Sequence, residues 1–412
     1  MITRLVGVLV AALVLSAAGT APTYAYTPPP GASFNDPGRD RDAQNRLAVN
    51  VRQTIHSVPR GGIIRMAIYS FDRPDIADAL IAACRRHVSV QIVLNDNWIS
   101  GPTRRMRHIM GTDIDPRWDD ACHRREEARN PRQSGRRPHP VPSFVKICLS
   151  ACRGGAGNQH MKFFAFSQAG SASNVIMTGS VNLTEYAAST HWNDMYTVVE
   201  KPAMFKAYGE MLRELAEDRR VPQRYRVMSE GDFVTEFGAR SRTTRVNDPV
   251  KQRLDKVRCR TGTGYGASGR TVIRIAMYAW VGNRGRFLAY KVADLRRQGC
   301  EVRVILSGAS RAVKRILRNS GVSMRSADLD LDGDYYTGFG ETAWERFTHE
   351  KWMALNGYWN GRNQRVVWTG SENWSDKSLI NDEVTLQIPK TGAHRAYAQH
   401  FDYLWNFRTR SF

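Results

Sequence analysis

Residues 158–167, NQHMKFFAFS, place a histidine and a lysine two positions apart and then continue into four apolar residues. Residues 348–356, THEKWMALN, repeat this arrangement near the C-terminus. A short apolar run of this kind is typical of a buried β-strand. A single His-x-Lys sequence occurs by chance in many chains, so its meaning depends on whether its surroundings also repeat.

The surroundings do repeat, in the same order along the chain. The strand-like segment IRMAIYSF at residues 64–71 resembles IRIAMYAW at residues 273–280. The other matched strand-like segments are 88–94 with 301–306, 158–167 with 348–356, 174–182 with 365–373, and 193–200 with 381–388. Helix-like segments occupy 74–86 and 284–298, and then 201–216 and 393–407. Five strand positions in one order, with helices between them, predict a duplicated α/β unit.

The predicted architecture is two mainly parallel or mixed sheets, each flanked by helices on both faces and related by pseudo-twofold symmetry. A chain of 412 residues is longer than one hydrophobic core usually supports. We therefore expect an N-terminal half at 26–218, a connection at 219–258 with a helix near 248–258, and a C-terminal half at 259–412.

The N-terminus predicts an exported protein. Arg4 precedes an apolar run from Leu5 to about Ala18, and small residues lead to Ala25. This order is typical of a secretory signal peptide, 1–25, cleaved near Ala25. The apolar run is shorter than the roughly 20 residues that a membrane span requires. We therefore expect a soluble, extracellular protein.

The chain is strongly basic, with a formal net charge of +21 that becomes +20 once Arg4 is removed with the signal peptide. Such a charge favours polyanionic partners, which include nucleic acid, an anionic lipid surface and cell-wall phosphate polymers. A basic surface that serves only solubility is the simpler alternative.

Six cysteines form an even set, which in an exported chain favours disulfides over a zinc site. Cys259 and Cys300 precede the first and second strands of the C-terminal half, so we expect them to pair at one edge of a parallel sheet. Cys148 and Cys152 are four positions apart and are expected to pair with each other. Cys84 and Cys122 are then left as the third pair.

The doubled pattern resembles the phospholipase D superfamily, which carries His-x-Lys and, about twenty residues later, Gly-Ser-x-Asn in each half. The resemblance covers nearly the whole chain after the signal peptide. The N-terminal set is His160, Lys162, Gly179, Ser180 and Asn182. The C-terminal set is His349, Lys351, Gly370, Ser371 and Asn373.

The resemblance implies cleavage of a phosphodiester without a cofactor or a metal. Two half-sites that meet at the pseudo-twofold axis supply a nucleophile, an acid and cations for the phosphoryl oxygens. In relatives the N-terminal histidine is generally the nucleophile, so His160 is expected to form a phosphohistidine. His349 would then be the acid and base. The sequence alone does not exclude the reverse assignment.

A catalytic histidine also needs a partner that fixes its tautomer. Asn-Asp occurs at 193–194 and again at 381–382, each time before a final strand. Relatives carry an acid near this position, so Asp194 and Asp382 are the candidates, with Glu383 as an alternative for the second. A turn cap is the competing explanation.

The chain departs from the family pattern five residues after each lysine. Most members carry Asp there, whereas this chain has Ser167 and Asn356. Tyrosyl-DNA phosphodiesterases also lack that Asp, so its loss does not exclude catalysis, although it weakens the link to the lipid-hydrolysing branch.

The segment between the second strand and His-x-Lys differs most between the halves. In the N-terminal half it is rich in arginine, which suits phosphate groups. The arginines are 104, 105, 107, 117, 124, 125, 129, 132, 136 and 137. A solvated basic loop, offset by Glu126 and Glu127, is the alternative.

In the C-terminal half the same region is acidic at 328–334 and aromatic at Tyr335, Tyr336, Phe339 and Trp344. Its acids match the opening of an EF-hand loop, but Phe339 stands where the bidentate Glu belongs. A polar loop is therefore favoured over a calcium site. The aromatic side chains could contact lipid or stack on bases.

The sequence therefore favours a secreted, monomeric phospholipase D that hydrolyses or transfers phospholipid head groups, gives phosphatidic acid and transiently contacts an anionic membrane surface. A nuclease-type phosphodiesterase acting on DNA or RNA is the alternative, and a non-catalytic polyanion-binding protein is the third hypothesis.

Overall fold

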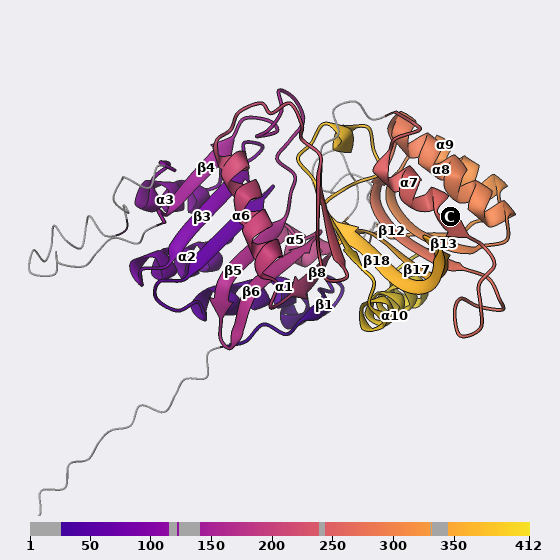
Figure 1. Cartoon of the computed structure of the whole chain (residues 1–412), viewed down its shortest axis with the longest axis horizontal. Helices are drawn as coiled ribbons and strands as arrows, with labels where there is room; N and C mark the ends of the chain where they lie inside the picture. The colour runs from indigo at the N-terminus through magenta and orange to yellow at the C-terminus, as the bar shows by residue number, and fades with distance from the viewer. Residues whose placement is uncertain (1–25, 115–121, 123–140, 239–243, 330, 332–344) are drawn as a thin grey trace, which may run out of the picture.

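The computed structural model describes residues 26–114, 122, 141–238, 244–329, 331 and 345–412. Two α/β halves lie side by side, with the N-terminal half in indigo and magenta and the C-terminal half in orange and yellow (Figure 1). The duplicated architecture predicted from the sequence is confirmed. The predicted signal peptide, most of the arginine-rich segment and most of the acidic and aromatic loop lie outside the described residues.

The N-terminal half is built on a seven-stranded sheet with the order β1-β8-β6-β5-β2-β3-β4. Its strands are β1 Gly31–Phe34, β2 Ile63–Ile68, β3 Ser89–Asn95, β4 Phe144–Cys148, β5 Phe163–Ala169, β6 Ala172–Gly179 and β8 Asp194–Val198. Strands β2, β3 and β4 are parallel, while β5 pairs antiparallel with β2 and with β6. The sheet is therefore mixed, and its parallel and antiparallel parts meet at β2 and β5.

The C-terminal half repeats this order in the sheet β14-β13-β12-β17-β18-β19-β10-β9, with β11 beside β17. Its strands are β9 Arg226–Glu230, β10 Phe233–Phe237, β11 Val257–Arg258, β12 Val272–Trp280, β13 Glu301–Ala309, β14 Ser323–Ser326, β17 Lys351–Trp359, β18 Arg362–Gly370 and β19 Val384–Ile388. All seven strands of the N-terminal sheet thus have positional counterparts in the C-terminal sheet, two more than the sequence comparison found.

Helices cover both faces of each sheet because the strands are apolar on both sides. In the N-terminal half these are α1 Arg41–His56, α2 Pro74–Arg85, α3 Gly101–Met110, α5 Glu185–Thr190 and α6 Pro202–Ala216. In the C-terminal half they are α7 Pro249–Asp255, α8 Gly282–Arg297, α9 Arg311–Asn319 and α10 Thr391–Phe407, with the short 3₁₀ turn η2 Lys377–Leu379. The predicted helices correspond to α2, α6, α7, α8 and α10, whereas α1, α3, α5 and α9 were not predicted.

One hydrophobic core is shared by the two halves. It contains Tyr208 and Leu212 of α6 together with Trp352 of β17 and Tyr397 and Phe401 of α10, all fully or almost fully buried. The outer helices of each half close two further cores. Burial of apolar area across the junction therefore fixes the halves relative to each other.

Part of the connection belongs to the C-terminal sheet. Strand β10 pairs antiparallel with β19, and β9 pairs with β10. Helix α7 begins after Asp248, whose side chain caps it by accepting from the Lys251 amide. The connection thus packs against the second half as well as joining the two.

All three expected disulfides are present: Cys84–Cys122, Cys148–Cys152 and Cys259–Cys300. The last joins the residues before β12 and β13, as expected for two parallel neighbours. Among the described residues, no helix is both long enough and apolar enough to cross a membrane.

Candidate active site

Each His-x-Lys motif begins a central strand and is bonded to the other half at that point. The His160 amide donates to the Asp382 carbonyl at 2.9 Å, and the His349 amide donates to the Trp192 carbonyl at 2.9 Å. The second contact belongs to a small sheet of β15 Asp328–Leu329, β16 Arg346–Thr348 and β7 His191–Trp192. This reciprocal pairing brings both motifs to one junction.

The two motifs open into a single cavity of about 560 Å³. Its walls include both histidines, His160 and His349, and both asparagines of the Gly-Ser-x-Asn motifs, Asn182 and Asn373. The two half-sites therefore form one site, with residues of each half facing residues of the other.

The two histidines have chemically different partners. His160 Nδ1 lies 2.9 Å from Glu383 Oε2, a carboxylate, whereas His349 Nδ1 lies 3.1 Å from Asn193 Oδ1, a neutral amide. The Asn193 amide nitrogen donates to the Ala187 carbonyl, so its oxygen faces the histidine as an acceptor. Each Nδ1 therefore carries the hydrogen, and each Nε2 is left for chemistry.

The alternative named from the sequence, Glu383, is thus the partner of His160, and the expectation that Asp194 and Asp382 orient the histidines is wrong. The reason is that the Asn-Asp sequences of the two halves differ by two residues in their register against the strands that carry the motif glycines. Gly179 pairs with Met195, and its counterpart Gly370 pairs with Thr385. Asn193 is consequently the structural counterpart of Glu383.

Asp194 and Asp382 have other buried partners. Asp194 accepts hydrogen bonds from Tyr397 at 2.7 Å and from Thr369, and burial raises its pKa. Asp382 accepts from Arg153 at 3.0 Å and from Arg224 at 3.2 Å. These carboxylates therefore fix the framework at the junction rather than the imidazoles.

The lysines are buried, and each Nζ donates to the carbonyl of its own motif histidine, at 2.9 Å for Lys162. Burial lowers the pKa of Lys162 to about 7, opposed by Glu383. Burial, with Lys162 nearby, also lowers the pKa of Lys351 well below its ordinary value. An anion between the two lysines would favour their charged forms.

Both histidines are held neutral in the unliganded site. Burial lowers the pKa of His160 to about 4, although Glu383 opposes the shift. Burial, followed by the charge of Lys351, lowers the pKa of His349 well below its ordinary value. His160 is thus available as an uncharged nucleophile.

The motif serines support the histidine partners. Ser371 Oγ donates to Glu383, and Ser180 Oγ donates to Asn193 Oδ1 at 3.2 Å. Asn182 Oδ1 is buried and has no hydrogen-bond partner in the described part of the chain, whereas Asn373 Oδ1 accepts from the Ala279 amide at 3.2 Å. The side chains of the two asparagines thus lie in different hydrogen-bonding environments.

Two tyrosines were not recognised from the sequence. The Tyr69 ring lies edge-on to His160 with centroids 4.9 Å apart, and the Tyr278 ring lies 4.8 Å from His349. Lys162 Nζ and Lys351 Nζ lie over these same rings, at 5.2 and 4.8 Å. The available signal was their matching place in the duplicated strands IRMAIYSF and IRIAMYAW.

The positions that depart from the family pattern lie at the opposite ends of their strands from the motifs. Ser167 Oγ accepts from the Ile63 amide at 2.8 Å, and Asn356 pairs with Val272 at the start of β12. Both substitutions are therefore remote from the histidines, in positions that hold strands together.

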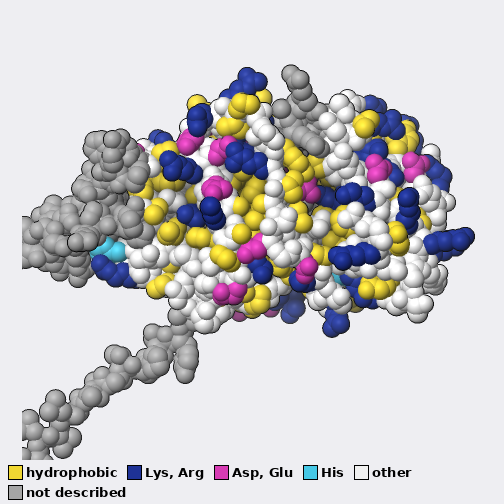
Figure 2. All heavy atoms as spheres, in the orientation of Figure 1, with side chains coloured by type: hydrophobic (Ala, Val, Ile, Leu, Met, Phe, Trp, Pro, Cys, Tyr) yellow, Lys and Arg dark blue, Asp and Glu magenta, His cyan; other side chains and the backbone are white. Residues whose placement is uncertain are grey.

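Basic side chains are spread over both halves of the molecular face in Figure 2, among fewer acidic ones. Of the arginine-rich segment, Arg104, Arg105 and Arg107 lie on α3, and Arg105 pairs with Asp78. The other seven predicted arginines of that segment lie outside the described residues.

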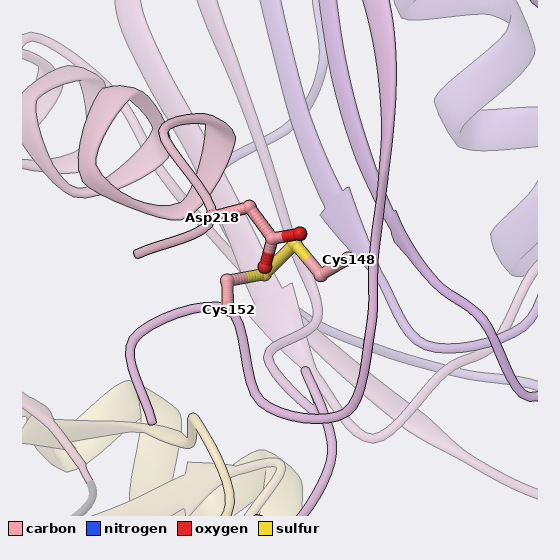
Figure 3. Close-up of side chains that lie close together, drawn as sticks. All are labelled: Cys148, Cys152 and Asp218. Atoms are coloured by element: carbon pink, nitrogen blue, oxygen red, sulfur yellow. A yellow bond between two sulfur atoms is a disulfide. The ribbon is translucent and has the colours of Figure 1, made fainter. Parts of the chain in front are cut away.

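One described group has a spacing that could hold a metal ion: Cys148, Cys152 and Asp218 (Figure 3). Its two sulfur atoms are bonded to each other in a disulfide, which removes the thiolates that a metal would need. We therefore assign this group a structural role.

The family described as "Cardiolipin synthase, PLD-like domain" matches residues 60–217 and 267–405, one copy in each half. The chain belongs to this family. It is thus a member of the phospholipase D superfamily, whose enzymes act on phosphodiester bonds. No curated protein matches the chain.

Three solved structures are similar to the chain, and the first of them, with a TM-score above 0.5, supports the fold. Phosphatidylserine synthase from Haemophilus influenzae Rd KW20 is 10% identical with a TM-score of 0.54, over 90% of this chain and 86% of that one. Polyphosphate kinase from Porphyromonas gingivalis is 13% identical with a TM-score of 0.47, over 91% of this chain, which spans 50% of the kinase. Nuc, a phospholipase D family member from Salmonella typhimurium, is 21% identical with a TM-score of 0.26, over 45% of this chain and 93% of that one.

Proposed function

We propose that the protein cleaves phosphodiesters through a covalent phosphohistidine on His160. The observation that carries this proposal is the convergence of both motifs on one cavity with unlike partners, Glu383 on His160 and Asn193 on His349. A site built from two equivalent halves would not distinguish nucleophile from acid, whereas these partners do.

In the first step the His160 Nε2 lone pair attacks phosphorus, and the bond from phosphorus to the leaving oxygen breaks. The imidazole becomes cationic as the bond forms, and the Glu383 carboxylate at Nδ1 stabilises that charge. The His349 Nε2 proton passes to the leaving oxygen. A neutral Asn193 partner suits this role, because it does not hold the proton on the ring as a carboxylate would.

In the second step His349, now without that proton, takes one from water or an alcohol, whose oxygen attacks phosphorus as the bond to His160 Nε2 breaks. Lys162 and Lys351 would stabilise the charge on the phosphoryl oxygens throughout, with Asn182 and Asn373 as further donors. The substrate's own negative charge raises the pKa of His349 so that it can act as the acid.

For the substrate we propose a phospholipid, so that the enzyme acts as a phospholipase D and gives phosphatidic acid by hydrolysis. Four apolar side chains are exposed on loops beside the cavity: Trp98 at 47%, Ile99 at 38%, Leu149 at 73% and Ile380 at 43%. We call them the apolar rim. Exposed apolar groups beside a basic, phosphate-directed site favour an anionic membrane surface.

Hydrogen bonds place these loops against the cavity. Asn97, next to Trp98, donates to Ser70 beyond β2, and Ser150, next to Leu149, accepts from the Gln159 amide beside His160. Ile380 precedes Asn381, which lines the cavity. The apolar rim would therefore bring a phospholipid head group to the histidines.

A nuclease-type phosphodiesterase is the second candidate, and the net charge of +21 is the observation that favours it. A non-catalytic polyanion-binding protein would carry the same charge, but it would not need the Glu383 carboxylate beside Nδ1 of His160. We also propose that the protein is exported as a monomer. The N-terminal sequence and three disulfides support export, and the presence of both half-sites in one chain supports the monomer.

The test combines substrate choice with covalent trapping. Purified protein in EDTA is incubated separately with phosphatidylcholine vesicles and with plasmid DNA; we expect phosphatidic acid from the first and intact plasmid from the second. His349→Asn, given a phosphodiester with a p-nitrophenolate leaving group, should accumulate label on His160, because that leaving group needs no acid.

Label on His349 in His160→Asn would reverse the roles. Plasmid cleavage without lipid turnover would reject the phospholipase D in favour of the nuclease-type phosphodiesterase. Inactivity on both substrates would favour the non-catalytic polyanion-binding protein. Substantial activity in both single mutants would refute the shared site.

A further inference from the structure

A third histidine, His191, lines the same cavity and takes no part in the steps above. It lies on β7, and its ring stacks near His349 with centroids 5.0 Å apart and an interplanar angle of 27°. Phe347 lies against it at 4.2 Å, and Tyr186 meets it edge-on at 5.0 Å. His191 is thus fixed by aromatic packing on the His349 side of the cavity.

Both ring nitrogens of His191 are buried and have no hydrogen-bond partner in the described part of the chain. The residue is buried, with 7% of its surface exposed. A buried polar atom without a partner costs stability, so such atoms in a folded protein point to a function or a ligand. His191 carries two of them next to the proposed acid.

The pseudo-twofold symmetry supplies an internal comparison. The strand register makes Asn381 the counterpart of His191, and both line the cavity. Asn381 is fully used in the framework, because it donates to Glu383 Oε1 at 3.0 Å and accepts from the Asn158 amide at 2.9 Å. A purely structural residue at position 191 would be expected to make similar bonds.

We propose that His191 binds a hydroxyl group of the alcohol that leaves or enters at His349, and so selects polyol head groups and polyol acceptors such as glycerol. This inference rests on the proposed function, because His349 must be the acid and base for that alcohol to lie beside it. A neutral imidazole offers one donor and one acceptor, the pair that a hydroxyl satisfies.

The ring stays in this neutral form over the working range of pH. Burial, with the charge of Lys351, lowers the pKa of His191 to about 3. Tyr186, His349 and Lys351 are the titratable groups around it that the structure relates to the ring. A quaternary ammonium head group such as choline has no hydroxyl hydrogen for the imidazole acceptor, so it would gain nothing from His191.

The test is a competition between two acceptor alcohols on one donor lipid. Wild-type protein and variants receive phosphatidylcholine vesicles with equal concentrations of glycerol and 1-propanol, and the ratio of phosphatidylglycerol to phosphatidylpropanol is measured. His191→Phe keeps the ring but removes both nitrogens, so this ratio should fall about tenfold, the scale of one or two lost hydrogen bonds. His191→Asn, which keeps a donor and an acceptor, should retain most of the preference.

The product ratio is independent of how much variant folds, and His191→Leu provides a second apolar variant if His191→Phe expresses poorly. His394→Phe, at a buried histidine of α10 away from the cavity, is the matched control and should leave the ratio unchanged. A ratio unchanged in both apolar variants overturns the inference. Absence of any lipid product with wild-type protein would instead reject the proposed function, and the His191 assignment with it.

Discussion

Glu383 of the C-terminal half lies 2.9 Å from Nδ1 of His160 in the N-terminal half, so the imidazole of one repeat is oriented by the carboxylate of the other. Asn381 donates to the same carboxylate at 3.0 Å, and Ser371 donates to it as well. These bonds satisfy a buried charge and fix the tautomer of His160.

Replacing Glu383 by Gln should lower kcat by about 10³-fold or more, the scale for a histidine that loses its orienting carboxylate. The measurement is the rate of covalent labelling of His160 in rapid-quench experiments. Asp382→Asn is the matched comparison, because the sequence pattern favoured Asp382 for this role.

Asp382→Asn should instead destabilise the fold, by about 3–5 kcal/mol, because it removes a charged partner of buried Arg153 and Arg224. Thermal unfolding should show this loss of stability. At a temperature at which Asp382→Asn remains folded, covalent labelling of His160 should be retained. The reverse pattern, with labelling lost in Asp382→Asn and kept in Glu383→Gln, would refute the observed register.

The pH dependence of kcat/KM should report the pKa values of the site without bound substrate. In the proposed mechanism His160 attacks as a neutral imidazole, so activity should rise as the pH passes its pKa of about 4. His349 must carry a proton as the acid and Lys162 must be a cation. Activity should therefore fall as the pH passes the pKa of His349, which burial lowers well below its ordinary value, and again as it passes the Lys162 pKa of about 7. Bound phosphodiester favours the charged lysine, so the decline in kcat should occur at higher pH.

Lys162→Arg tests the assignment of the upper limit. Arginine stays charged at any accessible pH, so the additional decline near neutrality should disappear and only the decline due to His349 should remain, even if the maximal rate is lower. If the decline near neutrality persists unchanged in Lys162→Arg, its cause is the titration of a group other than Lys162.

Activity should survive chelators. In the proposed mechanism, the cations and donors that a metal would otherwise supply to the phosphoryl oxygens come from Lys162, Lys351, Asn182 and Asn373. Turnover lost in EDTA and restored by calcium would contradict this mechanism and would direct attention to the acidic segment at 328–334. Restoration by zinc would contradict it equally.

The disulfides should contribute unequally to stability. Loop entropy predicts about 4 kcal/mol for Cys259–Cys300, which spans 41 positions, and about 2 kcal/mol for Cys148–Cys152, which spans 4. Paired Cys→Ser variants, compared by denaturant unfolding, should show the larger loss for the first pair. Equal losses would mean that loop entropy does not control the difference.

The apolar rim should matter only at a lipid surface. Replacing Trp98 and Leu149 by Ser should weaken binding to anionic vesicles at least tenfold, by removing apolar area that would enter the bilayer. Hydrolysis of a short-chain, monomeric phospholipid should be unchanged. Val227→Ser and Phe407→Ser, at exposed apolar positions outside the rim, are the controls. Equal effects of all four substitutions would refute a specific surface.

The duplicated fold and the residues around the histidines could be predicted because they depend on local sequence. His-x-Lys and Gly-Ser-x-Asn recur with strand periodicity, and the apolar strands on each side recur with them. The Cys259–Cys300 pairing followed from the order of parallel strands, and the Cys148–Cys152 pairing followed from their spacing of four. Tyr69 and Tyr278 occupy matching positions in the sequence repeat. Their place in the site could not be predicted from the repeat alone, because it depends on the packing of each ring against a motif lysine.

Of the two histidine partners, the sequence named Glu383 only as an alternative and did not name Asn193, because both depend on strand register across the two halves. Asn193-Asp194 and Asn381-Asp382 share a sequence but occupy different positions in their strands. Relative to the residue that pairs with the motif glycine, the second Asn-Asp lies two residues earlier than the first. A shift of two keeps each side chain on the same face of a strand, so the alternation of apolar residues gives no warning. His191 was missed for the same reason.

The amide bonds that join each motif to the opposite half are reciprocal: His160 to Asp382, and His349 to Trp192. Reciprocal contacts of this kind define the self-complementary interface of a twofold dimer. An ancestor with a single repeat would have had to assemble as two identical chains to close the site. In a chain that carries both repeats, closure of the site no longer depends on concentration and the two copies are free to differ, as they do here, where one imidazole faces a carboxylate and the other an amide.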